Sequence, residues 1–393
     1  MKKLSYKFTI GACLAGYVVQ AITVNFPPLL YVMFMEQFNI TYEQISFLIS
    51  FMFIVQLCVD VTLSKILTSK NIRIIAVIAN GMVVTGLILL AILPGIMANK
   101  FLALILAKFF YSCGSGVMDV MVSPVVEACP TESKSGSMAF THSFYCWGTA
   151  LTIIAATAFF AVFGQENWQL LALIFAILPL LDGIAMAVMP IGKIESEKSY
   201  GNSPFKHKIF FIAMALMFVS GAAELSIGQW ASTFAEKGLN ISKTAGDLAG
   251  PCLFAIMMGI GRTLYTLLVK KIRLINYMLI SGAFCIVGYV LAGFAPNPVI
   301  SLVGIAICGL SVAILWPGVL SLTVLKLGSS STLFGILACC GDFGCTVGPA
   351  VIGFISDSYG GNISMGLKFG TIFPIAILVF LIIFRQSRKT SLE

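Results

Sequence analysis

The chain has 393 residues, of which 59% are apolar and only 10% are charged. Soluble globular proteins carry about 25% charged residues, so this composition excludes a soluble protein and predicts one that crosses a membrane many times. The formal net charge of +8 comes from Lys and Arg residues in the loops between the apolar runs. Membrane topology explains this distribution, so we expect no nucleic-acid partner.

Apolar runs long enough to cross a bilayer follow one another along the chain. About 20 such residues form one membrane helix, and twelve helices are expected, an all-α polytopic fold. Their predicted starts are Phe8, Gln44, Ile72, Phe101, Ser135, Gln169, Lys208, Thr244, Leu274, Pro298, Ser329 and Ser364. A polar linker at residues 192–207 predicts two six-helix bundles, one over residues 1–191 and one over residues 208–393.

Lys and Arg are distributed unevenly over the loops. If both termini are cytoplasmic, most of these residues fall on the cytoplasmic side, as the positive-inside rule requires. The other side receives only Lys100, Lys237, Lys243 and Lys368. We therefore expect cytoplasmic termini and assign the chain to the cell membrane, as an inner-membrane protein of a bacterium.

The two halves of the chain repeat weakly. Gln20 and Asn25 in the first helix have the same spacing as Glu224 and Gln229 in the seventh. Two related halves are the arrangement of many secondary transporters, whose solute sites lie near the bilayer midplane. The repeat therefore predicts a transporter with internal pseudo-symmetry.

Prolines occur inside several predicted helices. They are Pro27, Pro28, Pro124, Pro251, Pro317 and Pro349. A proline removes one backbone hydrogen bond and allows a bend, so we expect each of these positions to break its helix.

Asp119 is the most informative ionisable residue. It lies in the apolar run 101–126, and a carboxylate in hydrocarbon costs a few kcal/mol or more, so it is a functional hypothesis by default. An ion pair with Lys108 is the structural alternative, but eleven helical residues separate the two by about 16 Å. We predict that Asp119 carries the coupled proton, with Asp342 as the rival site and Glu224 as a third.

His142 follows Asp119 by about one helix and lies close to Tyr145 in the sequence. An imidazole changes its charge between pH 5 and 8, so His142 suits proton handling. A hydrogen bond to a substrate hydroxyl and a structural bond to a backbone carbonyl are the alternatives. All three interpretations stay open at this point.

Further substrate contacts are predicted on other helices. A carboxylate and an amide bind hydroxyls, and an indole packs on the apolar face of a sugar, so Glu224, Gln229 and Trp230 are candidates; a structural bond between helices is the alternative. Three residues are expected to line the same cavity: Asn25, Tyr145 and Trp316. Three others are expected in gating or structural charge pairs: Asp60, Lys108 and Arg262.

No catalytic or cofactor motif occurs in the sequence. The eleven cysteines lack metal-ligand spacing, and neither a nucleotide-binding motif nor a protease or esterase motif is present. We therefore expect no enzyme, no cofactor and no metal. An ion gradient, not nucleotide hydrolysis, is the expected source of energy.

The fourth and fifth helices carry two linked motifs. Asp119 precedes Ser123-Pro124, and the run His142 to Gly148 reads HSFYCWG. Together they resemble the fucose permease branch of the major facilitator superfamily, in which an acidic residue precedes Asn-Pro and a Gln-x-Phe-x-x-Phe-Gly-like run follows. The resemblance implies the major facilitator fold and proton-coupled sugar symport by alternating access.

The first helix departs from that branch. An acidic residue is expected just before Pro-Leu-Leu, but the sequence has Pro27-Pro28-Leu-Leu with Asn25 as the nearest polar residue. The predicted substrate is therefore a sugar or a similar small polar solute. Alternatives are an exporter of amphipathic compounds by proton antiport, an organic-anion carrier that uses Lys108 and Arg262, and, remotely, a non-transporting sensor. The expected partners are a small solute, protons and the bilayer, and the expected working form is a monomer.

Overall fold

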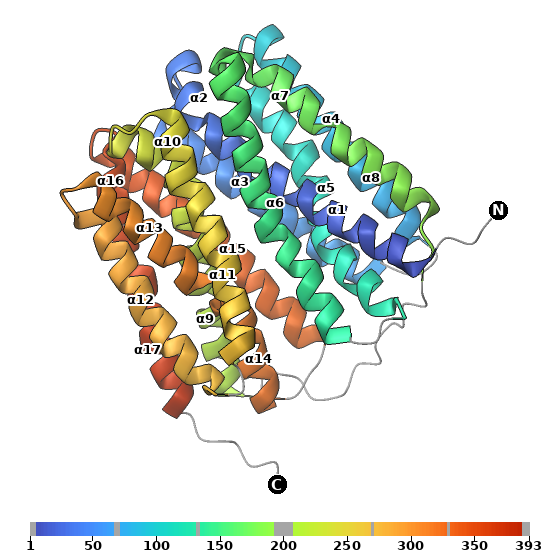
Figure 1. The fold of residues 1–393 in the computed structure, drawn as a ribbon, viewed down its shortest axis with the longest axis vertical. Helices are drawn as coiled ribbons and strands as arrows, with labels where there is room; N and C mark the ends of the chain where they lie inside the picture. Colours follow the sequence, from blue (N-terminus) through green and yellow to red (C-terminus); the bar gives the residue numbers. More distant parts are fainter. Residues whose placement is uncertain are drawn as a thin grey trace. The chain divides into compact units, whose positions relative to one another are not determined.

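The computed structural model describes residues 5–66, 71–130, 134–191, 207–268, 271–327 and 331–386. Within these ranges all regular elements are helical (Figure 1). Among them, 12 helical segments are long and apolar enough to cross a membrane, which confirms the predicted number. Which end faces the cytoplasm stays a prediction, and the predicted linker lies outside the described residues except for His207.

The first six spans contain ten helical elements in chain order. They are α1 (Tyr6–Asn25), the 3₁₀ turn η1 (Pro27–Leu30), α2 (Tyr31–Phe38), α3 (Tyr42–Ile66), α4 (Ile72–Ile96), α5 (Lys100–Ala128), α6 (Lys134–Phe163), the 3₁₀ turn η2 (Gln165–Asn167), α7 (Trp168–Phe175) and α8 (Ile177–Val188).

The last six spans are more often interrupted. They contain α9 (Lys208–Thr233), the π turn η4 (Phe234–Gly238), α10 (Lys243–Asp247), the π turn η5 (Leu248–Cys252), α11 (Leu253–Leu268), α12 (Leu274–Phe294), α13 (Pro298–Val312), α14 (Leu315–Leu327), α15 (Ser331–Ser358), α16 (Ile363–Gly370) and α17 (Ile372–Gln386).

The chain separates into two compact units. The first holds the residues up to Ile40 and those from Phe51 to the end of α8, and the second holds Thr41–Ser50 and the elements from α9 onward. The predicted bundle boundaries at residues 191 and 208 stay a prediction.

In the first unit, α4 packs against α5, α7 and α8, and α1 packs against α5, α6 and α8. Figure 1 shows α4 beside α8 along one edge of this unit. The close approach of α4 to α5 depends on Gly86, since a Cβ there would lie 2.5 Å from the backbone nitrogen of Tyr111. The absence of a side chain at this position therefore sets the distance between the two helices.

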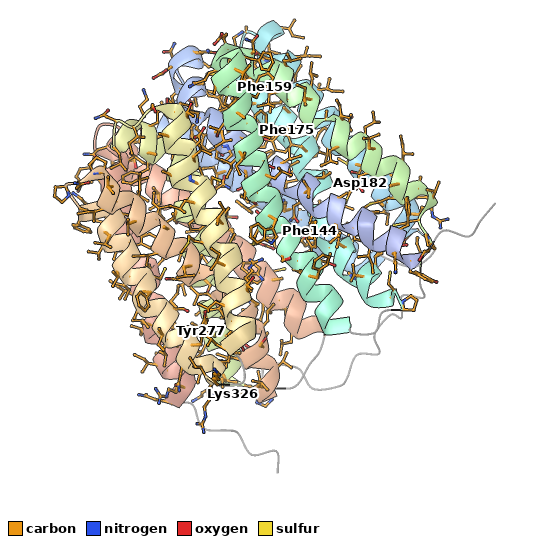
Figure 2. All side chains as sticks on the ribbon, viewed as in Figure 1. Phe144, Phe159, Phe175, Asp182, Tyr277 and Lys326 are labelled. Atoms are coloured by element: carbon orange, nitrogen blue, oxygen red, sulfur yellow. The ribbon has the colours of Figure 1, made fainter. Side chains whose placement is uncertain are left out.

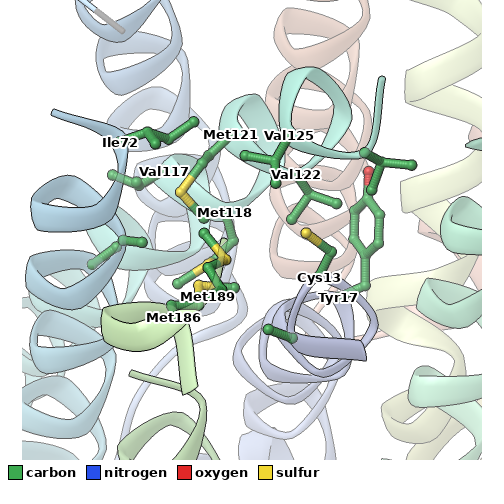
Figure 3. Close-up of a cluster of buried hydrophobic side chains, with 14 residues drawn as sticks. Cys13, Tyr17, Ile72, Val117, Met118, Met121, Val122, Val125, Met186 and Met189 are labelled. Carbon is green, nitrogen blue, oxygen red and sulfur yellow. The ribbon is translucent and has the colours of Figure 1, made fainter. Parts of the chain in front are cut away.

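The core of the first unit is rich in sulfur (Figure 3). Met118, Met121, Met186 and Met189 are each 0% exposed, and Cys13 of α1 packs among them. Methionine is unbranched and adapts its shape to irregular gaps. These side chains fill the space where α1, α5 and α8 meet.

In the second unit, α9 packs against α15 and α17, and α12 packs against α13, α16 and α17. Along the contact between α9 and α15, Gly344 leaves room for the carbonyl oxygen of Phe218, which a Cβ would overlap. The glycine-rich segment of α15 is thus a helix-packing surface, as small residues commonly provide in membranes.

The intramembrane prolines fall into two groups. Pro27-Pro28 forms η1, Pro251 lies in η5, and Pro317 follows the break between α13 and α14, as predicted. Pro124 and Pro349, however, lie inside uninterrupted α5 and α15, so the predicted breaks there are wrong. Membrane helices tolerate proline where neighbouring groups and local adjustments satisfy the freed backbone carbonyl.

Asn39 and Asn240 end the first spans of the two halves in the same way. Both have φ of 54°, and each is followed by Ile and a hydroxyl residue. Asparagine enters this left-handed region more readily than most residues because its short side chain bonds locally. The shared turn supports the weak internal repeat seen in the sequence.

Candidate solute and proton site

The polar face of α1 organises the site in the first unit. It carries Tyr17, Gln20, Thr23 and Asn25, and each interacts with a side chain of α5 or α6. Residues three positions apart lie on one side of a helix, so Tyr17, Gln20 and Thr23 follow one another in a line, whereas Asn25 points away from Thr23 and toward α6. In an otherwise apolar span, such a line marks a functional surface.

Asp119 is at the centre of this line. Its carboxylate interacts with the side-chain amide of Gln20 on α1. Asp119 itself is exposed, although every residue from Tyr111 to Met118 is buried. An ionisable group at this depth faces the bundle interior or a water-filled space, because lipid does not tolerate it. The carboxylate therefore combines an accessible surface with a bonding partner on α1.

A buried hydrogen-bond network supports this pair. Thr23 Oγ1 lies 2.8 Å from the Gln20 carbonyl oxygen and 3.0 Å from Ser115 Oγ. Gln56 Nε2 of α3 donates to the same Ser115 Oγ over 3.0 Å. Satisfied networks of this kind fix side-chain positions in a low-dielectric interior. The network thus connects α1, α3 and α5 one turn away from Asp119.

Two residues of α6 flank the same face. His142 is exposed, and its Nδ1 lies 3.0 Å from Tyr17 Oη. Asn25 Nδ2 donates to Thr149 Oγ1 over 3.0 Å and to the Ala21 carbonyl over 2.9 Å. The structure therefore places three predicted residues, Asn25, Asp119 and His142, at the contacts of α1 with α5 and α6.

The other predicted residues of the first unit make different contacts. Lys108 of α5 is 2% exposed, and its ammonium lies 5.7 Å from the ring centroid of Tyr111. Tyr145 is half-buried and packs against the sulfur-rich core, and Asp60 is half-buried on α3.

In the second unit, Glu224 of α9 and Arg262 of α11 interact electrostatically. Both side chains are half-buried. Glu224 was expected in proton coupling or substrate binding and Arg262 in a gating or structural charge pair, and the structure brings these opposite charges together.

Gln229 and Trp230 lie inside the helix packing of the second unit. They are 2% and 0% exposed, and Trp230 Nε1 donates to the Pro349 carbonyl over 3.0 Å. The indole therefore joins α9 to α15. Contact of these two residues with a substrate stays a prediction.

Trp316 of α14 packs against Gly341 of α15, the residue before Asp342. The Trp316 ring occupies the space that a side chain at Gly341 would fill. Asp342, the next residue, is half-buried. Contact of either side chain with a substrate or proton stays a prediction.

The family model of the Major Facilitator Superfamily matches residues 8–349. The chain belongs to this superfamily. The membership confirms the resemblance drawn from the sequence, and the superfamily and the structural neighbours are transporters. The chain is accordingly a multi-pass membrane protein of a transporter family.

Among individual proteins, the membrane protein MosC of Rhizobium meliloti is 25% identical over 258 residues. The match covers 64% of this chain and 61% of MosC, which is less than two thirds of that protein.

Solved structures resemble the whole chain. A D-xylose-proton symporter aligns with a TM-score of 0.77 at 12% identity, covering 98% of this chain and 97% of its own. The nucleoside transporter NupG gives 0.73 at 14% identity, covering 96% and 99%. The E. coli fucose:proton symporter FucP gives 0.66 at 16% identity, covering 98% and 100%. These similarities show the superfamily fold.

The sequence did not predict Gln20 as the partner of Asp119. The available signal was an amide in an apolar helix, but the pairing depends on the register between α1 and α5. It also missed Asp247, whose Oδ1 lies 2.9 Å from Lys243 Nζ. Their i,i+4 spacing is a recognised signal for an ion pair.

Lys243, which the sequence assigned to a loop, begins α10 in a buried cluster. Its Nζ also lies 2.9 Å from Ser232 Oγ and 3.7 Å from Glu236 Oε2. The cluster ties the end of α9 and the turn η4 to α10 and has a structural role.

Proposed function

We propose that this chain is a secondary active transporter that couples the uptake of a sugar or similar small polar solute to protons moving in the same direction. The observation that carries the proposal is the pairing of exposed Asp119 with Gln20 inside two membrane spans. The fold neighbours described as proton symporters, for xylose and for fucose, support the same class.

Protonation of Asp119 would change the hydrogen-bonding character of the site. An ionised carboxylate only accepts hydrogen bonds, whereas a protonated one also donates. The Gln20 Oε1 atom is buried and has no hydrogen-bond partner. With the proton bound, Asp119 can donate to this oxygen or to a solute hydroxyl. Proton loading and solute binding are thereby linked at one pair of side chains.

The neighbouring polar groups suit a solute with several hydroxyls. His142 contacts α1 at Tyr17, and Asn25 lies beyond Gln20 on the same helix, so both are proposed to take part in binding. In the second unit, Glu224, Trp316 and Asp342 remain proposed contacts or proton sites.

Transport into proteoliposomes tests the proposal. An inward proton gradient should drive accumulation of at least one labelled solute from a panel of sugars, polyols and nucleosides, and a protonophore should abolish it. Asp119→Asn should lose uphill accumulation but keep solute exchange. Glu43→Gln, which removes an exposed carboxylate in the first turn of α3, should keep both.

Other outcomes separate the alternatives. Proton-driven efflux of amphipathic compounds without sugar uptake would establish the exporter. Uptake of organic anions that Arg262→Gln abolishes would establish the anion carrier. Ligand binding without flux would establish a sensor, and unchanged accumulation by Asp119→Asn would remove Asp119 from coupling.

A further inference from the structure

Asp182 of α8 is a buried carboxylate that the proposed transport site does not use. Figure 2 labels it within the first unit, where it is only 2% exposed. On α4, Asn80 is 1% exposed and donates from Nδ2 to Asp182 Oδ2 over 3.2 Å. This bond joins α4 to α8 in the interior of the unit.

Each partner also has one side-chain oxygen that lacks a hydrogen-bond partner. Asp182 Oδ1 and Asn80 Oδ1 are both buried and accept no hydrogen bond. A buried polar atom without a partner loses its interaction with water and gains nothing in return. Carboxylate and amide oxygens only accept hydrogen bonds. Two such oxygens on a hydrogen-bonded pair therefore indicate that one hydrogen, shared between them, is missing.

The surroundings provide no compensating charge for an ionised Asp182. From α1, a Cβ at Gly16 would lie 3.1 Å from Met186 Cε, 3.5 Å from Met118 Sδ and 3.7 Å from Asp182 Oδ2. The titratable neighbour on α1 is the Cys13 thiol, which interacts electrostatically with Asp182. Within the described ranges, Asp182 has no ion-pair partner.

We propose that Asp182 is a proton-binding site, separate from Asp119, in which one proton is held between Asp182 Oδ1 and Asn80 Oδ1. The bound proton turns Oδ1 of Asp182 into a donor to Asn80 Oδ1, while Asn80 Nδ2 donates to Oδ2. The acid and the amide then form a ring of two hydrogen bonds. No charge remains in the apolar interior, and both oxygens without partners are satisfied.

This site supports the helix that carries the transport residues. Gly16 passes directly over Asp182, and Tyr17 and Gln20 follow on the next turn of α1. Ionisation of Asp182 would place an uncompensated charge beneath α1. It would weaken the packing of α1 against α8. The proton on Asp182 therefore stays bound while the transported proton comes and goes, and Asp182 is a positioning residue.

The melting temperatures of three variants, compared with that of the parent protein, test the site. Asp182→Asn keeps a ring of two hydrogen bonds, so its melting temperature should stay within about 2 °C of the parent. Asp182→Leu removes the carboxyl partner of Asn80 and leaves the buried Asn80 Oδ1 without a donor, so it should melt lower by about 3 °C or more. The exchange of both groups, Asn80→Asp with Asp182→Asn, should restore the parental value.

Infrared spectroscopy of protein labelled at the aspartate carboxyl carbon gives the direct measurement. Subtracting the Asp182→Asn spectrum from the parent at neutral pH should reveal a protonated carboxylic-acid band, and the same band should persist in Asp119→Asn. A carboxylate band in its place would overturn the proposal. Loss of uphill accumulation in Asp182→Asn would also overturn it, because the proton would then be cycled. The infrared and melting measurements need no solute, so they can fail or succeed independently of the proposed function.

Discussion

The side chains of Gln20 on α1 and Asp119 on α5 interact across two antiparallel helices. The next contact along the same interface, between Thr23 and Ser115, follows the opposite direction of the two chains, as expected for a first and a fourth membrane span. The register that these contacts set brings the amide to the carboxylate.

Replacing Gln20 by Leu should weaken solute binding. The variant removes a hydrogen-bonding amide worth about 1.4 kcal/mol, which corresponds to a roughly tenfold higher half-saturation concentration. Gln169→Leu, at an exposed position of α7, is the control and should leave uptake unchanged. Equal affinity of the Gln20 variant and the parent would exclude Gln20 from the solute site.

Variants at His142 and Tyr17 distinguish the three interpretations of the histidine. If His142 handles protons, His142→Gln should flatten the dependence of uptake on pH, while Tyr17→Phe should leave it intact. If the imidazole only holds Tyr17, the two single variants and the double variant should have the same effect on melting temperature, since all remove one contact. If it binds solute, only His142→Gln should raise the half-saturation concentration.

Gly344→Ala should destabilise the second unit strongly. Its Cβ would overlap the Phe218 carbonyl oxygen, which belongs to a helix backbone and cannot move aside. Overpacking of this kind costs roughly 1–3 kcal/mol or more, measurable as a lower melting temperature in detergent. The control is Gly11→Ala, whose Cβ would meet no atom within 4 Å and whose helix propensity improves. Equal melting of both variants would contradict the close contact.

Lys243→Met should also destabilise the protein, because it leaves Asp247, which is 1% exposed, without its cation. Removal of one partner from a buried pair costs about 3–5 kcal/mol. The double variant Lys243→Met with Asp247→Leu removes both charges and should recover part of this loss in thermal unfolding. If the double variant is less stable than Lys243→Met, the pair does not act as described.

The spans of this fold could be predicted because the bilayer imposes a length on every apolar run. The predicted starts at Ile72, Lys208, Leu274 and Pro298 coincide with the starts of α4, α9, α12 and α13. The prolines were harder to interpret. Pro124 and Pro349 look like the other prolines in the sequence, and only their neighbours on adjacent helices decide whether the helix continues.

The site could be predicted only in part. A carboxylate such as Asp119 is conspicuous in an apolar run, since its burial is costly wherever it lies. Its bond to Gln20, and the bond of Asn80 to Asp182, depend on how neighbouring helices align, which a single sequence does not encode locally. Trp230 illustrates the same difficulty, because an indole that would suit a sugar instead bonds a backbone carbonyl in the packing.

The thioether core beneath α1 has a mechanical consequence. Branched aliphatic side chains have few allowed rotamers and pack in one arrangement. A helix packed against them cannot shift without leaving cavities. Met118, Met121, Met186 and Met189 can follow a small displacement of α1 by changing rotamers, because their side chains are unbranched and flexible. The helix that carries Gln20 is therefore packed against side chains that can adjust to small shifts, while its polar residues keep their contacts with α5 and α6.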